Sequence, residues 1–361
     1  MSTWNKCRNI LCVRLDNMGD LLMSGPAIRA VKEAFQSNIT VLTSSKAKGL
    51  ANVLPFIDEV MVFDSPWMKL PEQDRKGFMN LVENIRMRNF DGCIIFTVYS
   101  QNPMPAVLLA YLAGIPLRLA YCRENPYDLL TDWLPDPEPY SVIRHQVRRD
   151  LKLVESIGAL SSNDDLHFPI DEVAELRTTR KLTGMGIRID MPFLVFHCGV
   201  SEPKRQFPAY LWIQAANLAA ETFGWPILFT GSAEEIPYIR SIQSEVSAET
   251  FLLAGELDLN EFAVVLNRAQ SIVSVNTGTI HLAAALQTPL VVLYARSNPQ
   301  HTPWNVPHRV LEYSIPEAMK SRNEIIRYVD DLLYSEHKDY PSSVEICESI
   351  KGLLSSALKT V

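Results

Sequence analysis

An aspartate just after an apolar run and a glycine turn is the first candidate for acid–base chemistry. The run is Ile10 to Leu15, and the turn after it contains Gly19 and Asp20. Glycine permits a tight backbone path there, and Asp20 would lie at the start of the next helix. A carboxylate in that position can accept a proton from a substrate hydroxyl. Helix capping is the competing interpretation, because aspartate is favoured in the first turn of any helix.

Two adjacent cations form the second candidate. The segment from His197 to Pro208 contains an apolar strand end, Ser201, and the pair Lys204 and Arg205, and a proline-started helix follows. A cation beside a helix start suits a diphosphate, because charge-assisted hydrogen bonds and the helix dipole act together. An ordinary solvated Lys-Arg pair is the alternative.

The third candidate is a small-residue turn that leads into an alanine-rich helix. It runs from Asn276 to Ala285 and includes Thr277, Gly278, Thr279 and His281. The free backbone N–H groups of such a helix start bind anions, and the two threonines add hydroxyl donors. A purely structural role is the alternative for His281.

A fourth turn, Gly231 to Glu235, offers Ser232 and the carboxylates of Glu234 and Glu235. A carboxylate here could bind ribose hydroxyls, and capping of the following helix is an equally good explanation.

Several motifs of other enzyme classes are absent from the sequence. There is no G-x-G-x-x-G, no P-loop lysine motif, no G-x-S-x-G and no zinc-type spacing of His and Cys. A strict D-x-D triplet is also missing. These absences are consistent with a reaction that needs no metal and no cofactor, in which the protein's own cations neutralise a leaving diphosphate.

Alternating strand and helix patterns are expected to position these segments. Such alternation predicts an α/β fold with parallel sheets, in which ligands bind beyond the carboxyl ends of the strands. The first set of predicted strands is Ile10 to Leu15, Ile39 to Leu42, Glu59 to Phe63 and Cys93 to Val98. The second set is Phe193 to Phe196, Pro226 to Thr230, Phe251 to Leu253, Ser271 to Val275 and Leu290 to Leu293.

The length of 361 residues favours two domains of roughly 150–180 residues each. We expect one Rossmann-like domain at 1–170 and a second Rossmann-like domain at 171–335. The remaining residues, 336–361, should form a helix (Ser343 to Leu358) that packs back on the N-terminal domain.

Composition limits the partners and the compartment. The net charge of −7 disfavours binding to nucleic acid. The six cysteines contain no C-x-x-C pair, which is typical of reduced thiols in a cytoplasmic protein. The uncharged window Gly92 to Leu117 contains three prolines and predicts a strand, a loop and a helix rather than a membrane span. A peripheral contact with the inner face of the membrane stays open.

Taken in order, several segments resemble glycosyltransferase family 9, the ADP-heptose:lipopolysaccharide heptosyltransferases and their relatives. They are Ile10 to Leu22, Gly25 to Ala30, Asp58 to Val60, Ala113 to Pro116, Leu228 to Glu235, Leu253 to Gly255 and Asn276 to Ala285. The resemblance covers about residues 9 to 305. It implies a GT-B fold, in which two Rossmann-like domains with parallel sheets face each other across a cleft. In that fold the N-terminal domain, 1–170, would bind the acceptor, and the C-terminal domain, 171–335, would bind the nucleotide sugar.

The resemblance also implies roles for residues. It implies a metal-free transferase that inverts the anomeric carbon, with Asp20 as general base and a glycan or lipopolysaccharide-type acceptor. The phosphate ligand falls on Lys204 or Arg205, and both stay open. Nucleotide and diphosphate contacts fall on Thr277, Gly278 and His281. Ribose and base contacts fall on Glu234 or Glu235 and on Leu257, and Gly19, Ser201, Ser232 and Asn276 complete the expected binding set.

One departure from the family bears on the donor sugar. Asn276 stands where the family commonly has aspartate, which removes a charge near the sugar. Asn276 keeps a non-catalytic nucleotide-sugar-binding protein open as an alternative. A GT-B sugar-nucleotide isomerase or epimerase, which needs no acceptor, is a second alternative. Arginines of the N-terminal half could meet an anionic acceptor, or belong to a solvated mixed surface: Arg118, Arg123, Arg144, Arg148 and Arg149.

Overall fold

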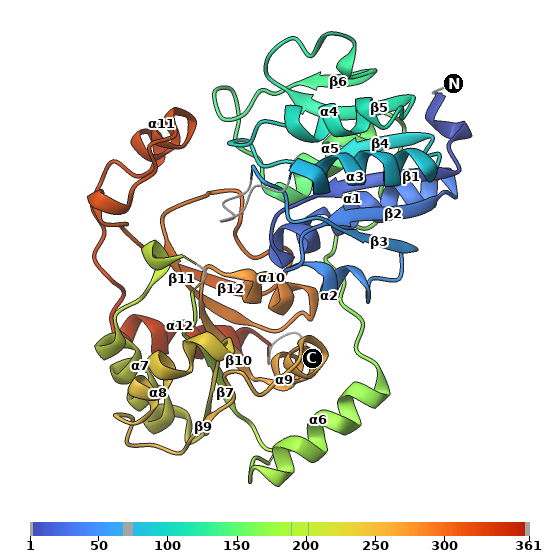
Figure 1. Cartoon of the computed structure of the whole chain (residues 1–361). Helices are drawn as coiled ribbons and strands as arrows, with labels where there is room; N and C mark the ends of the chain where they lie inside the picture. The colour runs from blue at the N-terminus through green and yellow to red at the C-terminus, as the bar shows by residue number, and fades with distance from the viewer. Residues whose placement is uncertain (1–2, 68–74, 189, 201, 358–361) are drawn as a thin grey trace. The chain divides into compact units, whose positions relative to one another are not determined.

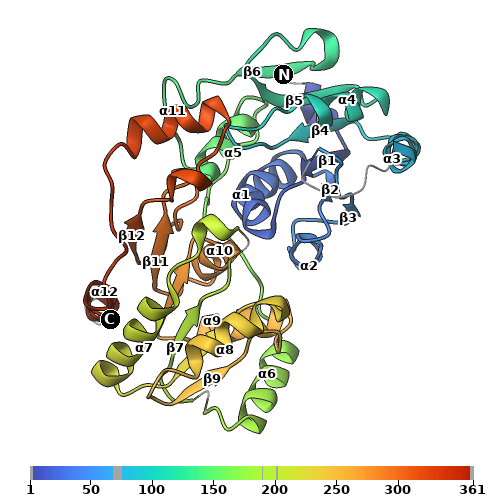
Figure 2. The ribbon, with the colours of Figure 1, turned by 60° about the vertical axis from the view of Figure 1, so that its left-hand side comes forward.

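The computed structural model of the chain describes residues 3–67, 75–188, 190–200 and 202–357. It divides into two compact units, Met1–Pro169 and Ile170–Val361. In each unit, helices flank a six-stranded parallel sheet (Figures 1 and 2). The α/β class predicted from the alternation of strands and helices is confirmed in both units.

The sheet of the first unit has the strand order β3-β2-β1-β4-β5-β6. Its direction of growth reverses between β1 and β4, which is where ligands bind in sheets of this kind. The strands are β1 (Asn9–Arg14), β2 (Asn38–Thr43), β3 (Glu59–Val62), β4 (Gly92–Ile95), β5 (Leu117–Cys122) and β6 (Asp132–Pro135).

Helices cover both faces of this sheet. They are α1 (Met18–Phe35), α2 (Lys48–Ala51), α3 (Arg75–Met87), α4 (Met104–Leu112) and α5 (Gln146–Glu155). One core packs side chains of α3 and α4 on alternate residues of the central strands, such as Leu11, Val13 and Cys93. Helices α1 and α5 contact each other. Residues near the start of α1 are thereby brought close to residues of α5, far along the chain.

Two strands of the first unit were not predicted from the sequence. Strand β5 contains Arg118, a residue that interrupts an apolar pattern, and yet its side chain is only 8% exposed. The guanidinium donates to the carbonyls of Ile115, Asp128 and Leu129, so the charge is satisfied by backbone. Strand β6 is an edge strand that ends in Pro135, and its alternating half-exposed pattern gives a weak signal.

The second unit repeats the plan with the strand order β12-β11-β10-β7-β8-β9. The strands are β7 (Leu194–His197), β8 (Ile227–Thr230), β9 (Thr250–Leu252), β10 (Ser271–Val275), β11 (Leu290–Ala295) and β12 (His308–Tyr313). The polar edge strand β12 was also not predicted from the sequence. The sheet reverses between β7 and β10, so the loops after these two strands lie side by side.

Helices again cover both faces of this sheet. The helices of this unit, in chain order, are α6 (Glu172–Gly184), α7 (Ala209–Phe223), α8 (Ile236–Gln243), α9 (Leu259–Arg268), α10 (Gly278–Ala285), α11 (Glu324–Leu333) and α12 (Ser343–Ala357). One core joins α7, α8 and α12 to the sheet through residues such as Phe196, Trp212 and Ile350.

The C-terminal helix packs within the second unit. Helix α12 packs against α7 and the neighbouring strands of the second unit, and its Cys347 thiol lies 3.3 Å from the Thr222 hydroxyl. The physical reason is its apolar face, since Ile346, Ile350 and Leu353 belong to the core of that unit. Residues 358–361 of the expected segment lie outside the described residues.

The six cysteines are free and buried, as the sequence predicted. Burial raises the pKa of Cys12 to about 12, which makes it an unreactive thiol.

Candidate functional site

Asp20 lies in the first turn of α1, directly beyond the carboxyl end of β1. Asn17 is the N-cap of this helix, and its backbone N–H donates to Oδ2 of Asp20 over 3.2 Å. The other carboxylate oxygen, Oδ1, accepts from Nη2 of Arg14 over 3.1 Å. The capping interaction expected as an alternative is therefore present, and it fixes the carboxylate while leaving the side chain 14% exposed.

Arg14 is the centre of a buried ionic cluster. Its guanidinium is fully buried, and its Nε lies 3.0 Å from Oδ2 of Asp16. Burial would lower the pKa of Arg14, but Asp16, Asp20 and Asp150 together raise it, so the cation is retained. Burial also raises the pKa of Asp16, against the opposing effect of Arg14, and Gln101 donates to the same carboxyl.

Asp150 is a member of this cluster that sequence reasoning missed. It lies on α5 and is 1% exposed, and it accepts from the Ser24 hydroxyl at 2.7 Å and from Gln146 Nε2 at 2.8 Å. Burial raises its pKa to about 6, although Arg14, Ser24, Arg149 and Gln146 oppose this. Its contact with Ser24 spans 126 positions of the sequence. No local pattern could have revealed it.

A small cavity adjoins Asp16 at the carboxyl ends of β1 and β4. Its volume is about 240 Å³. The walls are largely apolar, and Asp16, Gln101 and Asn102 supply polar edges. The remaining lining residues are Val13, Leu15, Trp67, Ile95, Phe96, Thr97, Pro103, Pro105 and Ala106. Apolar walls with a few polar groups are the usual composition of a small-molecule site.

Most of the candidate arginines of the first unit form ion pairs or hydrogen bonds within that unit. Arg149, for which an anionic acceptor and a solvated surface were both kept open, is instead fully buried and binds Asp136 and Glu138. Arg123 donates to the carbonyls of Tyr99 and Glu138. The more exposed arginines are Arg144, near Glu138, and Arg148, paired with Asp164.

In the second unit, the loop after β7 meets the loop after β8. Nδ1 of His197 lies 3.0 Å from the Thr230 hydroxyl, and burial lowers the pKa of His197 to about 4. The ring is therefore neutral near pH 7. The Cα of Gly199 faces the carboxylate of Glu235 so closely that any side chain there would collide with it.

The two glutamates of the fourth turn have different surroundings. Oε2 of Glu235 accepts from the backbone N–H of Ser232 over 2.7 Å, as a helix cap. Glu234 is exposed, and so is Ser232. Leu257 lies half-buried in the loop between β9 and α9. Of the two carboxylates, Glu234 is the one accessible to a ligand.

The two adjacent cations also differ. Nη1 of Arg205 donates to the carbonyl of Asn276 over 2.8 Å, and Nη2 donates to Glu202 at 3.1 Å. Lys204 makes an ion pair with the same Glu202 at 2.9 Å. Arg205 thus connects the loop after β7 to the loop after β10, whereas among the described residues the ion pair of Lys204 is with the half-exposed carboxylate of Glu202. Ser201 lies outside the described residues.

The Asn276 side chain joins the ends of two neighbouring strands. Its Nδ2 donates to the carbonyl of Ala295 at 3.0 Å and to the Ser297 hydroxyl at 3.1 Å, and its Oδ1 accepts from the N–H of Ala295 at 3.2 Å. An amide satisfies a carbonyl and an N–H together, which a carboxylate cannot do. The structure thus provides a local reason for asparagine at this position.

The start of α10 contains the remaining predicted ligands. Thr277 is the N-cap in an extended conformation, and Gly278 is the first helical residue. The Oγ1 atom of Thr277 is buried and makes no hydrogen bond within the described part of the chain. His281 is 4% exposed, and its ring contacts that of His301 edge-on. A helix start with an unused hydroxyl has the composition of an anion site.

The described residues contain no group of three or more His, Cys, Asp or Glu side chains arranged to hold a metal ion. None of the helices described is both long enough and apolar enough to cross a bilayer.

Comparison with protein families finds one match over most of the chain. The model of glycosyltransferase family 9 (heptosyltransferase) matches residues 78–326. Among curated proteins, lipopolysaccharide heptosyltransferase 2 of Escherichia coli K12 is 25% identical over 305 residues, which cover 81% of this chain and 84% of that protein.

Two solved structures share the fold. A family 9 glycosyl transferase from Veillonella parvula superposes with a TM-score of 0.79 at 20% identity, covering 97% of this chain and 98% of that one. The ADP-heptose lipopolysaccharide heptosyltransferase II of E. coli gives a TM-score of 0.72 at 21% identity, covering 97% and 99%. Together with the two parallel sheets, these likenesses confirm the GT-B fold class that was expected from the sequence.

Proposed function

The chain belongs to glycosyltransferase family 9, the heptosyltransferase family, and from that premise we propose that it transfers a heptose from ADP-heptose to a hydroxyl of a lipopolysaccharide-type glycan. The donor and acceptor are taken from the names of its relatives. The proposal further specifies inversion at the anomeric carbon, without a metal.

The geometry of Asp20 is the observation that supports this proposal most directly. A general base must be oriented and must still reach its substrate. Asp20 meets both needs, since Arg14 and the Asn17 N–H hold its two oxygens and the side chain keeps 14% exposure. The cavity beside Asp16 offers an adjacent place for the acceptor sugar.

The proposed reaction is a single displacement. The acceptor oxygen forms a bond to the anomeric carbon while the bond from that carbon to the diphosphate oxygen breaks. The acceptor proton passes to the Asp20 carboxylate, and the electron pair of the broken bond leaves with ADP. Inversion follows from attack opposite the leaving group.

The second unit supplies the groups that would stabilise the leaving ADP. Lys204 provides a positive charge, and the first N–H groups of α10 with the Thr277 hydroxyl provide donors for phosphate oxygens. Glu234 is the accessible acceptor for the ribose hydroxyls. This set performs the charge stabilisation that a divalent ion performs in other transferases.

The test is release of ADP from ADP-heptose by the full chain, with and without a heptose-accepting lipopolysaccharide core. We expect release that depends on acceptor, together with a product of inverted anomeric configuration. Consumption of donor without acceptor would identify an isomerase or epimerase instead. Binding of ADP-heptose without any consumption under both conditions would identify a non-catalytic binding protein.

The donor preference is a second part of the test. GDP-, UDP- and dTDP-linked sugars, compared with ADP-heptose by the thermal shift they cause, would reveal a different donor. We expect the largest shift with ADP-heptose. A peripheral contact with the inner membrane face is part of the proposal, because a lipid-linked acceptor is presented there.

A further inference from the structure

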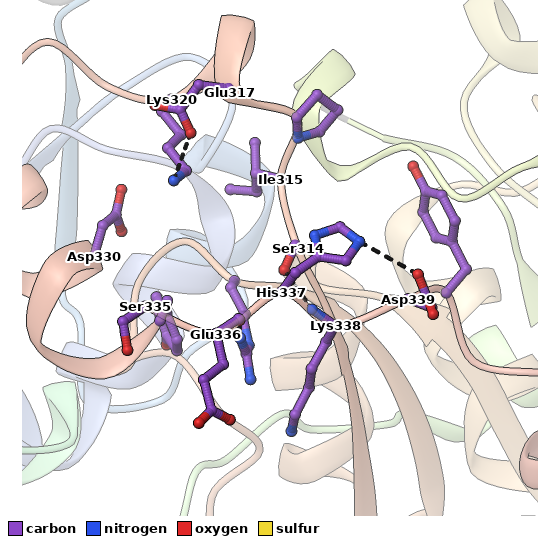
Figure 3. A pocket seen from close by; sticks show the side chains of 14 residues that line it. Ser314, Ile315, Glu317, Lys320, Asp330, Ser335, Glu336, His337, Lys338 and Asp339 are labelled. Atoms are coloured by element: carbon purple, nitrogen blue, oxygen red, sulfur yellow. Dashed lines mark hydrogen bonds and ion pairs between the residues drawn. The ribbon is translucent and has the colours of Figure 1, made fainter.

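A second and larger cavity lies in the second unit, in the part of the chain that follows β12. Its volume is about 510 Å³, within the range of about 300–1,000 Å³ that small-molecule sites occupy. Its walls come from the segments 314–320 and 330–340 and from Arg296 (Figure 3). None of the described residues assigned above to the base or the donor lines it.

Most charged side chains of this cavity already have partners. Lys320 pairs with Glu317 at 2.7 Å, and His337 lies 3.3 Å from Asp339, as Figure 3 shows. Lys338 pairs with Glu312 at 3.0 Å. Arg296 also contacts Glu312, and its guanidinium lies over the Tyr334 ring. These side chains line the cavity, and their charges are largely neutralised by the ion pairs just described.

Asp330 is different. It lies near the end of α11 and lines the cavity, and it is 8% exposed. Its Oδ1 atom is buried and makes no hydrogen bond in the described part of the chain. Buried acceptors in folded proteins are nearly always satisfied, and an unsatisfied carboxylate oxygen is costly. The side chain lines the cavity, and rotation about its Cβ–Cγ bond would bring either carboxylate oxygen to a donor supplied there.

The surroundings of Asp330 point to a hydroxyl as that donor. Burial raises the pKa of Asp330, and the positive charges of Lys320 and Lys204 oppose this. A hydroxyl can donate to the carboxylate and at the same time accept from an ammonium group such as that of Lys320. Tyr334 and Tyr340 also line the cavity, and their aromatic side chains provide flat apolar surface for a sugar ring.

Two other ligand classes fit less well. An anion such as phosphate would meet four carboxylates in the lining, those of Glu317, Asp330, Glu336 and Asp339, against the cations Arg296, Lys320 and Lys338. A divalent cation needs a cluster of ligands, and the described residues contain no cluster of that kind here.

We propose that this cavity is a carbohydrate-binding subsite, in which the Asp330 carboxylate accepts a hydrogen bond from a hydroxyl of a neutral sugar ring. The subsite goes beyond the proposed transfer, because none of the residues invoked for that reaction builds it. The sugar can come from the donor or from the acceptor glycan, and the chemistry of recognition is the same in both cases.

The test is direct binding of sugars to the full chain. The probes are free mannose, glucose and a glycero-manno-heptose at millimolar concentration, followed by saturation-transfer NMR and titration. We expect the wild type to bind at least one of them, and Asp330→Asn to bind it about tenfold more weakly, because a hydrogen bond to a charged group is lost. Asp331→Asn is the matched control: it removes the same charge one position away from an exposed side chain, and should bind like the wild type.

A second variant tests the same subsite in case Asp330→Asn does not fold. Lys320→Ala changes a side chain that is 38% exposed, and should also weaken sugar binding while its melting temperature stays close to that of the wild type. The inference is overturned if the wild type binds none of the sugars, or if Asp330→Asn binds them as well as Asp331→Asn does. It is also overturned if inorganic phosphate binds and Asp330→Asn binds it more tightly, because the cavity would then be an anion site.

Two added measurements identify the source of the sugar and separate this inference from the proposed function. If the subsite holds the donor's sugar, Asp330→Asn weakens binding of ADP-heptose and leaves binding of ADP unchanged. If it holds the acceptor glycan, both nucleotides bind normally and only the free sugars are affected. Normal ADP-heptose turnover without any sugar binding would overturn the subsite alone, whereas sugar binding without turnover would overturn the transferase proposal alone.

Discussion

The buried guanidinium of Arg14 holds the carboxylate of Asp20, with 3.1 Å between Nη2 of Arg14 and Oδ1 of Asp20. The same guanidinium contacts Asp16, so one cation at the end of β1 carries two carboxylates. This arrangement orients Asp20, whose side chain keeps 14% exposure, whereas the Asp16 side chain is 9% exposed and accepts a hydrogen bond from Gln101. The two aspartates are therefore expected to differ in their effect on turnover.

Replacing Asp20 by asparagine should lower kcat by about 10²–10⁴, the usual contribution of a positioned base. Binding of ADP should be unchanged, because the phosphate groups proposed for it belong to the second unit. Steady-state kinetics of ADP release and titration with ADP measure the two effects. Asp16→Asn is the matched control, since it removes the other carboxylate from the same guanidinium. If Asp16→Asn lost more turnover than Asp20→Asn, the base would have been assigned to the wrong residue.

Lys204 and Arg205 should separate in their effects on binding and stability. Lys204→Ala should weaken ADP binding about tenfold or more through loss of a charge-assisted contact, with little change in melting temperature. Arg205→Ala should lower the melting temperature as well, because its guanidinium donates to the Asn276 carbonyl and to Glu202. Thermal unfolding with and without ADP measures both effects. Equal destabilisation by the two variants would contradict the connecting role given to Arg205.

Asp150 should make stability depend on pH. Its folded-state pKa of about 6 lies above the usual value of 3.8, so the folded protein binds this proton more tightly than the unfolded chain. Its contribution is therefore fully present below about pH 4 and is lost as the pH rises through 6, by up to about 3 kcal/mol. Asp150→Asn lacks this titration. The melting temperature of the variant minus that of the wild type should rise between pH 4 and 6 and then level off.

A flat difference between Asp150→Asn and the wild type across that pH range would show that the Asp150 carboxyl titrates normally. Asp164→Asn is a suitable control, because Asp164 pairs with the exposed Arg148 at the surface of the same unit. Its melting temperature should follow that of the wild type at each pH.

Replacing Asn276 by aspartate should destabilise the protein by about 1–3 kcal/mol, since a carboxylate cannot donate to the Ala295 carbonyl and would lie against it. Denaturant unfolding measures the loss of stability. Asn276→Ala removes the hydrogen bonds of both the amide nitrogen and the amide oxygen. Its loss of stability is the reference against which the aspartate variant is compared. An aspartate variant as stable as the wild type would show that the hydrogen bonds to Ala295 and Ser297 do not determine the residue here.

The repeated strand–loop–helix units, and the segments that follow the central strands, could be predicted from local sequence patterns alone. Asp20, Lys204 and the stretch from Thr277 to His281 each follow a strand whose signal is local, an apolar run and then a turn. The carboxyl ends of parallel strands meet at one edge of a sheet, so each segment could be assigned to that edge of its own sheet without coordinates. The unpredicted strands β5, β6 and β12 have weaker patterns, because polar residues or an edge position interrupt them.

The polar side chains that are buried together could be identified only from the tertiary structure. Asp150 meets Ser24 across 126 positions, Arg205 meets Asn276 across 71, and Arg149 turns inward to Asp136 and Glu138. Such contacts depend on how helices pack on the sheets, and a charged residue has the same local pattern whether it faces solvent or a buried partner. For the same reason, the unsatisfied carboxylate of Asp330 became visible only when the chain was folded around its cavity.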